Sequence, residues 1–122
     1  MNLEDIVSFQ KALADETRVR ILMVIYQHEL CLCHISHIVN LANSTLSKHL
    51  DILRRNELII KRKQGRFHYF SFNKKFQQQI EWLLTLLEND ITIKNDKIQI
   101  KKMIQQKLEH LPEIYAKEIT ND

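Results

Sequence analysis

The spacing of hydrophobic residues predicts that the chain begins with two helices. Near its start, apolar residues recur at the three- to four-residue period of an amphipathic helix: Leu3, Ile6, Phe9 and Leu13. A second segment, residues 16–26, is dense in Val, Ile, Leu and Met, and Asp15 before it suits the start of a helix. We therefore expect a break between two helices at about residues 14–15.

Two shorter helical patterns follow, separated by a turn. The first spans residues 31–39, and its apolar side is formed by Leu30, Ile35, Ile38 and Val39. Residues 40–44 are turn-like, and the side chain of Asn43 or Ser44 suits the cap of the next helix. That helix has leucines at positions i, i+4 and i+7, namely Leu46, Leu50 and Leu53. The sequence thus predicts a helix-turn-helix pair.

After this pair the pattern changes to that of a β-hairpin. Residues 58–72 place β-branched and aromatic side chains around a turn that contains Gly65, the only glycine in the chain. Two amphipathic helices follow the hairpin. The first is marked by Phe76, Ile80, Leu83, Leu84 and Leu87. The second is marked by Ile100, Ile104, Leu108 and Leu111. It must end before Pro112, which cannot continue a helix.

This order of elements is typical of a winged helix-turn-helix protein: mainly α with a β-hairpin wing, and five to six helices. We assign residues 1–90 to the winged DNA-binding and dimerisation domain, and residues 91–122 to a C-terminal helical extension. The apolar faces of the first helix and of the Phe76–Leu87 helix exceed what a domain of this size buries alone. The expected assembly is therefore a homodimer.

Positive charge is concentrated where the second helix of the pair and the hairpin lie. Residues 48–75 hold nine Lys or Arg against two acidic residues, a formal charge of +7. The remainder of the chain holds nine basic and thirteen acidic residues, a formal charge of −4. A stretch with this charge favours a polyanionic partner.

Double-stranded DNA is the partner that this arrangement predicts. A helix that enters the major groove needs one apolar face toward its own domain and one face of small polar and cationic groups toward the DNA. The candidate contacts on the helix are Ser44, Thr45, Ser47, Lys48 and His49. Those at the wing tip are Lys61, Arg62, Lys63 and Arg66. The alternative is a solvated charged surface with a hairpin that only supports the core, since charge runs are often no more than that.

The chain carries no sign of a membrane or export segment. Its apolar runs are shorter than the roughly 20 residues that span a bilayer, and Glu4 and Asp5 stand where a signal peptide would be basic. We expect a cytoplasmic protein without a membrane partner. Cys31 and Cys33 are two positions apart, a spacing that does not suit an ordinary structural disulfide and fits reduced thiols.

Four short segments together resemble the ArsR/SmtB metalloregulators. They are residues 13–22 (LADETRVRIL), 29–33 (ELCLC), 44–50 (STLSKHL) and 63–66 (KQGR). The resemblance covers about residues 5–90. It implies a repressor dimer that binds an operator and releases it when a toxic ion is bound. It implies no role for the residues after Asn89.

The box Cys31-Leu-Cys33 resembles the site of the arsenite- and cadmium-responsive members, which implies that the two thiolates bind the inducing ion. Thiolates select soft ions over hard ones, so the candidates are As(III), Sb(III), Cd(II), Pb(II) and Cu(I), with As(III) expected first. A third cysteine that many arsenite-responsive members carry is replaced here by Ser36, and the N-terminal arm cysteines of cadmium-responsive members are absent. The candidate third ligands are His34, His37 and His28. His37 lies at i+4 from Cys33 and so on the same helical face.

The spacing of the two cysteines also suggests how binding could act on the fold. Side chains at i and i+2 of an ideal helix point apart, so one small ion would require the first turn of the helix at 31–39 to unwind. The distortion would reach the recognition helix that follows. The zinc site that other members carry on the segment corresponding to Phe76–Leu87 is not expected, because that segment contains no histidine.

Four other interpretations stay open at this point. The cysteines could sense oxidants or persulfides in a repressor of the same fold, or be small buried hydrophobic residues. A thiol redox enzyme is disfavoured, because the usual redox pair has two intervening residues in a strand-helix context. A helical interaction module without a DNA partner would lack salt-dependent binding to duplex DNA.

Overall fold

The computed structural model describes residues 1–106, and Leu108 and Leu111 of the last predicted helix lie outside them. Helix α1 (Leu3–Leu13) starts with a capping box, in which the Asn2 side chain accepts from the Asp5 amide at 2.8 Å and the Asp5 carboxylate accepts from the Asn2 amide. Helix α2 (Glu16–Ile25) starts at Asp15, whose carboxylate accepts from the amides of Thr17 and Arg18. The predicted break is confirmed.

The helix-turn-helix consists of α3 (Leu32–Val39) and α4 (Asn43–Arg55). The turn between them begins at Asn40, which ends α3 in the left-handed region with φ of 56°. The prediction that Asn43 or Ser44 caps α4 is wrong. The cap position is Ala42, without a side-chain hydrogen bond, because α4 starts early enough to include both polar residues in its first turn.

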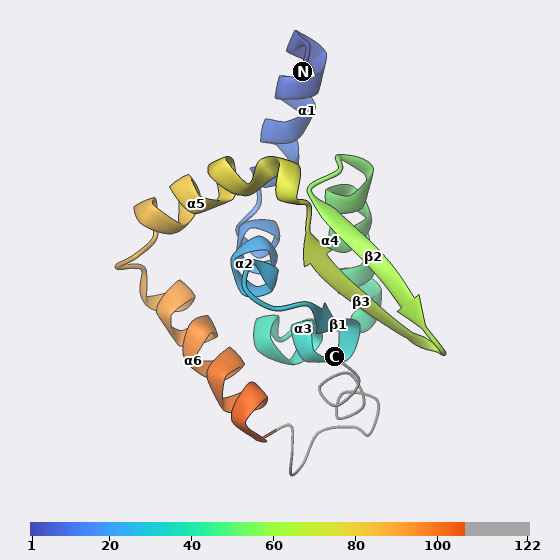
Figure 1. Ribbon diagram of the computed structural model, residues 1–122, viewed down its shortest axis with the longest axis vertical. Coiled ribbons are helices and arrows are strands. Elements are labelled where there is room, and N and C mark those ends of the chain that lie inside the picture. The colour runs from blue at the N-terminus through green and yellow to red at the C-terminus, as the bar shows by residue number, and fades with distance from the viewer. Residues whose placement is uncertain (107–122) are drawn as a thin grey trace.

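The wing is a three-stranded antiparallel sheet (Figure 1). Strands β2 (Ile59–Gln64) and β3 (Phe67–Phe72) form the predicted hairpin, and Gly65 in its turn has φ of 61°, where a residue with a Cβ would be strained. The third strand, β1 (Leu30–Cys31), pairs with β3 on the side opposite β2. The sequence did not predict β1, since two residues are too few for an alternating pattern to be detected.

The last two helices pack at the side of the molecule away from α4 (Figure 1). A short 3₁₀ turn, η1 (Lys74–Phe76), leads into α5 (Gln77–Leu86), and α6 (Ile91–Gln106) follows. Ile93 and Ile100 of α6 belong to the same buried cluster as the core of α2, α3 and α4. The helix assigned to a C-terminal extension therefore shares the core of the winged domain.

One buried ion pair fixes α6 to α2. The Asp96 carboxylate accepts hydrogen bonds from Nε and Nη2 of Arg20, each at 2.9 Å, and Arg20 Nη2 also donates to the Ile38 carbonyl at the end of α3. The bonds from Arg20 to Asp96 raise the pKa of the guanidinium above its usual value. This contact connects three helices around the Arg20 side chain.

The predicted apolar positions of α3 and α4 are buried, whereas Leu3 and Ile6 of α1 are exposed. In α4 the three leucines of the i, i+4, i+7 pattern face α2 and the sheet, and Leu46 and Leu53 have no exposed surface. Within residues 1–106, none of the helices combines the length and apolar character needed to cross a bilayer. The winged helix-turn-helix architecture with six helices is thus confirmed for the described part of the chain.

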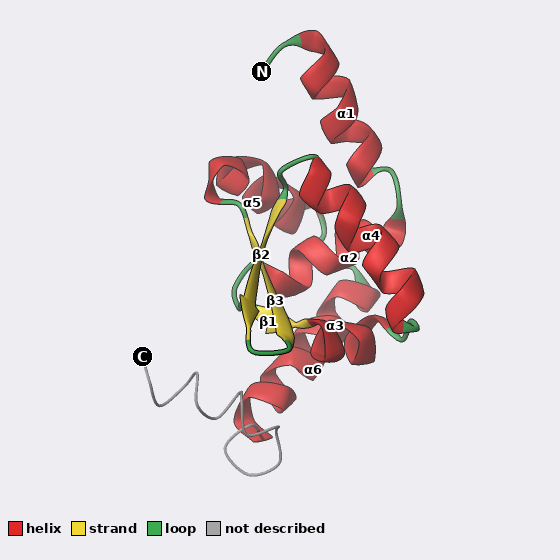
Figure 2. Ribbon diagram, turned by 90° about the vertical axis from the view of Figure 1, so that its right-hand side faces the viewer, coloured by secondary structure: helices red, strands yellow, loops and turns green. Residues whose placement is uncertain are grey.

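Some apolar surface stays uncovered on three helices. Figure 2 shows that α1 projects from the rest of the molecule, so much of its apolar face has no neighbour within the described chain. The large exposed apolar side chains of α1, α5 and α6 are Leu3, Ile6, Val7, Trp82, Leu86, Ile91 and Ile98. Uncovered faces of this kind agree with the expectation that α1 and α5 exceed what one domain buries alone.

Candidate functional site

The face of α4 that points away from the core carries the predicted DNA contacts. Ser44, Thr45 and Lys48 are exposed, and Ser47 is half-buried on the side toward the wing. The opposite flank holds His49, whose Nδ1 lies 3.3 Å from Nη1 of Arg18 and 3.9 Å from the Asp15 carboxylate. Four of the five helix candidates therefore lie on or beside the outer face, whereas His49 contacts the junction of α1 and α2.

The wing presents its cations to solvent on both sides of the turn. Lys61, Lys63 and Arg66 are exposed. Arg62 differs from these three, because its Nη2 donates to the Glu29 carboxylate at 2.6 Å and its guanidinium lies 4.7 Å from the centre of the Tyr69 ring. The arginine at this position connects the wing to the segment before β1.

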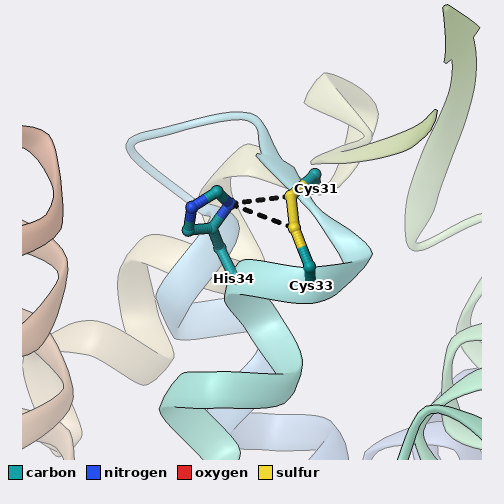
Figure 3. A group of neighbouring side chains, drawn as sticks. All are labelled: Cys31, Cys33 and His34. Carbon is teal, nitrogen blue, oxygen red and sulfur yellow. Dashed lines mark hydrogen bonds between the residues drawn. A yellow bond between two sulfur atoms is a disulfide. The ribbon is translucent and has the colours of Figure 1, made fainter. Parts of the chain in front are cut away.

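The two cysteines lie at the junction of β1 and α3, as Figure 3 shows. Cys31 is the last residue of β1 and the cap residue of α3, with extended backbone angles of φ −79° and ψ 160°. Cys33 lies in the first turn of α3, and the two Cα atoms are 5.5 Å apart. The expectation that both cysteines lie on one helix, with side chains that point apart, is therefore wrong: the strand-to-helix bend turns the two sulfurs toward each other.

The sulfur atoms of Cys31 and Cys33 are bonded to each other in this structure. Reduced thiols were expected because two residues so close in sequence seldom form a structural disulfide. The bend at Cys31 removes that obstacle, since the Cα separation falls within the usual range for disulfides of about 4.4–6.8 Å. Cys31 is buried, whereas Cys33 is an exposed residue.

A histidine completes the group. Nδ1 of His34 lies 2.7 Å from Sγ of Cys31 and 3.5 Å from Sγ of Cys33, and the potential ligand atoms of all three residues lie within 4.8 Å of one another. His34 is buried, whereas His37 and His28 are exposed and stand outside this group. The i+4 argument favoured His37 because it assumed that Cys33 projects along the helix, but Cys33 faces the start of the helix.

Ser36, at the position of the missing third cysteine, has a different role. Its hydroxyl donates to the carbonyl of Leu41 across the turn between α3 and α4. The thiol site and the DNA face are therefore connected by short paths: α3 leads through this turn into α4, and Cys31 pairs with Tyr69 on the wing strand β3.

Sequence reasoning did not include two residues beside the DNA face, one basic and one titratable, among the candidate contacts. Arg54 on α4 and His68 on β3 line a cavity between the helix and the wing, together with Ser47 and Lys61. The net charge of residues 48–75 includes Arg54, but no sequence signal shows which side of α4 it occupies relative to a hairpin formed later in the chain.

Comparison with known proteins gives consistent matches. Residues 15–61 match the family described as bacterial regulatory protein, arsR family. A cadmium resistance transcriptional regulatory protein CadC homolog of Staphylococcus aureus is 34% identical over 80 residues, which are 65% of this chain and 66% of that protein. The arsenic resistance transcriptional regulator ArsR2 of Pseudomonas putida is 31% identical over 96 residues, or 76% of this chain and 84% of the relative.

A solved structure agrees with these relatives. Reduced HlyU from Vibrio cholerae is similar with a TM-score of 0.64 and 32% identity, over 68% of this chain and 88% of HlyU. The similarity therefore extends from the sequence segments to the arrangement of the elements.

Proposed function

Because this chain belongs to the arsR family of bacterial regulatory proteins, we propose that it is a transcriptional repressor whose homodimer binds operator DNA and releases it when a soft ion binds Cys31 and Cys33. Residues 1–90 would form the DNA-binding and dimerisation domain, and residues 91–122 a helical extension that supports it. Its place would be the cytoplasm, where DNA is accessible and thiols are kept reduced.

The observation that carries this proposal is the grouping of Cys31, Cys33 and His34 at the start of the helix-turn-helix. Two thiolates and one imidazole form a ligand set that soft and borderline ions prefer. Reduction of the bond between the sulfurs would leave these ligand atoms close together without unwinding α3. An ion that draws the atoms into its own geometry would shift β1 relative to α3, and β1 is paired with the wing.

As(III) is the inducer that we expect first, followed by Sb(III), Cd(II) and Pb(II). A pair of neighbouring thiolates supplies most of the coordination of As(III), and His34, solvent or a small thiol would complete it. Relatives named as regulators of arsenic and cadmium resistance support this group of ions as a whole.

Operator binding would involve α4 and the wing. Ser44, Thr45 and Ser47 would read or approach base edges, whereas Lys48 would contact phosphates. Lys61, Lys63 and Arg66 of the wing would contact the backbone or an adjacent minor groove. His49 would support the placement of α4 rather than contact bases, because Arg18 and Asp15 surround its ring nitrogen.

The test of the switch uses Cys31→Ser and Cys33→Ser in the full chain under reducing conditions. Each variant should fold, dimerise and bind operator, yet retain the operator when arsenite is added, because serine keeps nearly the same volume and removes the soft ligand. His37→Ala, which changes an exposed residue of α3 outside the cysteine group, is the control, and it should respond as the wild type does. Normal release by both cysteine variants with every soft ion tested would refute the switch.

The DNA surface is tested by Lys48→Ala and Arg66→Ala. Each should weaken operator binding and reduce the slope of log K against log salt by about one unit, as for a single phosphate contact. Unchanged affinity and slope in both variants would refute the assignment of α4 and the wing to DNA.

A second candidate function is supported by the bonded sulfurs. In this case the inducing event is oxidation of the pair: two thiols lose two electrons and two protons to an oxidant such as a peroxide or a persulfide, and a sulfur-sulfur bond forms. The similar HlyU structure is that of the reduced protein. Release of operator by oxidant in the presence of a metal chelator, reversed by dithiol, would favour this function over metal binding.

A further inference from the structure

A cavity separates the recognition helix from the wing. Its volume is about 270 Å³, and its floor includes Leu50 of α4. Polar side chains come from both sides: Ser47, Asp51 and Arg54 from α4, with Lys61 and His68 from the two wing strands. The cavity adjoins the part of α4 assigned to DNA, because Ser47 is one of its lining residues.

The charges around this cavity are mainly positive. Arg54 and Lys61 face it from opposite sides, and Lys63 lies next to His68 in the register of the hairpin. Asp51 is the single acidic residue in the lining, and its carboxylate lies 4.0 Å from Nη1 of Arg54. The side chains of this pair are 64% and 43% exposed, so solvent screens their attraction. Arg54 therefore keeps most of its capacity to bind another anion.

His68 has a polar atom that the folded protein leaves unsatisfied. Its Nδ1 is shielded from solvent and has no hydrogen-bond partner among residues 1–106. Burial, followed by the charges of Lys61, Lys63 and Arg54, lowers the pKa of this histidine. Such a ring is neutral near pH 7, and an anion in the cavity would offset part of the positive charge around it.

We propose that this cavity binds one backbone phosphate of the operator, held by Arg54 from α4 and Lys61 from the wing, and that His68 couples this contact to the uptake of a proton. The inference rests on the proposed repressor function and adds residues and a linkage to it. A phosphate fits because it is a compact anion with several acceptor oxygens, and the lining offers donors from the helix and the wing together. One phosphate would thereby fix the distance between α4 and the wing on the DNA.

The linkage has a defined sign. The pKa of His68 is lowered in the free protein, and the bound phosphate raises it. Binding of DNA therefore takes up a proton at any pH between the pKa of His68 in the free protein and its pKa in the complex. Operator affinity therefore increases as the pH falls through this window. The Asp51 carboxylate repels the phosphate and stabilises the proton on His68. Removal of the Asp51 charge should therefore tighten operator binding.

The experiment measures binding of a labelled operator duplex to the full-length reduced dimer by fluorescence anisotropy. The measurements cover a series of salt concentrations and run from about pH 8 to about pH 5, because the pKa of His68 is lowered in the free protein. We expect Arg54→Gln to weaken binding about tenfold and to reduce the salt slope by about one unit. Asp51→Asn should tighten binding severalfold. Lys102→Gln, an exposed lysine of α6 far from this surface, is the matched charge control and should bind as the wild type does.

His68→Gln tests the proton linkage. This variant should lose the increase in operator affinity at low pH, while its circular dichroism spectrum shows that it remains folded. His28→Gln, which changes an exposed histidine that does not line the cavity, should keep this increase. The wild-type protein could bind duplex DNA with strong salt dependence while Arg54→Gln and His68→Gln show the same salt slope and the same pH dependence of affinity. This result would refute phosphate binding in the cavity and leave the repressor function standing. If the wild type shows no salt-dependent binding, the proposed function itself fails.

A second experiment distinguishes a phosphate of the DNA backbone from free inorganic phosphate. Inorganic phosphate is titrated into the protein without DNA while the His68 ring is observed by NMR. Loss of operator affinity in Arg54→Gln and His68→Gln would show that the cavity binds a phosphate of the DNA backbone. If Arg54→Gln binds operator as the wild type does and loses only the response of the His68 ring to inorganic phosphate, the cavity is a site for a free anion and the assignment to DNA is overturned.

Discussion

Replacement of Asp96 by alanine should destabilise the whole fold, although Asp96 lies on the last described helix. The Asp96 side chain is 7% exposed and that of Arg20 is 26% exposed. Two hydrogen bonds of 2.9 Å join them, and a bond to a charged group contributes about 1.5–3 kcal/mol. We expect a loss of about 2–4 kcal/mol, below the simple sum, because Arg20 is partly solvated and retains its bond to the Ile38 carbonyl.

The assay is urea unfolding followed by far-ultraviolet circular dichroism, at one protein concentration because a dimer couples stability to concentration. Glu88→Ala, an exposed acidic residue before α6, is the control and should change the free energy of unfolding by less than about 0.5 kcal/mol. The double variant Arg20→Met with Asp96→Leu should recover most of the loss, because no buried charge is left unpaired.

The result that would contradict this reasoning is an Asp96→Ala variant that unfolds at the wild-type midpoint with an unchanged slope. It would mean that α6 does not contribute to the cooperative unit. The proposed boundary at residue 90 would then also mark a boundary of stability, despite the burial of Ile93 and Ile100 in the common core.

The remaining predictions concern the wing, the dimer and the third ligand. Gly65→Ala should cost about 1 kcal/mol in urea unfolding because its φ of 61° is strained for alanine, although open space surrounds the position; an unchanged midpoint would contradict this. Trp82→Glu combined with Leu86→Glu should convert the dimer to monomer in equilibrium sedimentation, since these side chains are 63% and 62% exposed on one chain; a persistent dimer would place the interface elsewhere. His34→Ala should weaken Cd(II) binding by at least about tenfold, whereas His37→Ala should leave it unchanged; the opposite order would restore the i+4 assignment.

The helices could be predicted from the sequence because each carries its own local signals. Asp15 starts α2, the leucines of α4 repeat with the helical period, and Gly65 allows the hairpin turn. These features depend on residues within one or two turns of each other. Periodicity and propensity report such short-range constraints directly.

The chemistry of the candidate site was predicted as residue types but not as a geometry. Cys31 and Cys33 were identified as soft ligands, yet their relation depended on whether Cys31 belongs to a helix or a strand. That choice is made by β3, whose Tyr69 pairs with Cys31 from 38 positions further along the chain. A two-residue strand has no pattern of its own, so only its partner reveals it.

The tertiary structure alone decided which distant charges meet. Arg20 and Asp96 are separated by 76 positions, and each looks like an ordinary exposed helix residue until α6 packs on α2. Arg54 and His68 likewise line one cavity only because the wing folds back beside α4. Local sequence determines which residues form a helix or strand, whereas contacts between elements depend on how all apolar faces are buried together, and no short window of sequence contains that information.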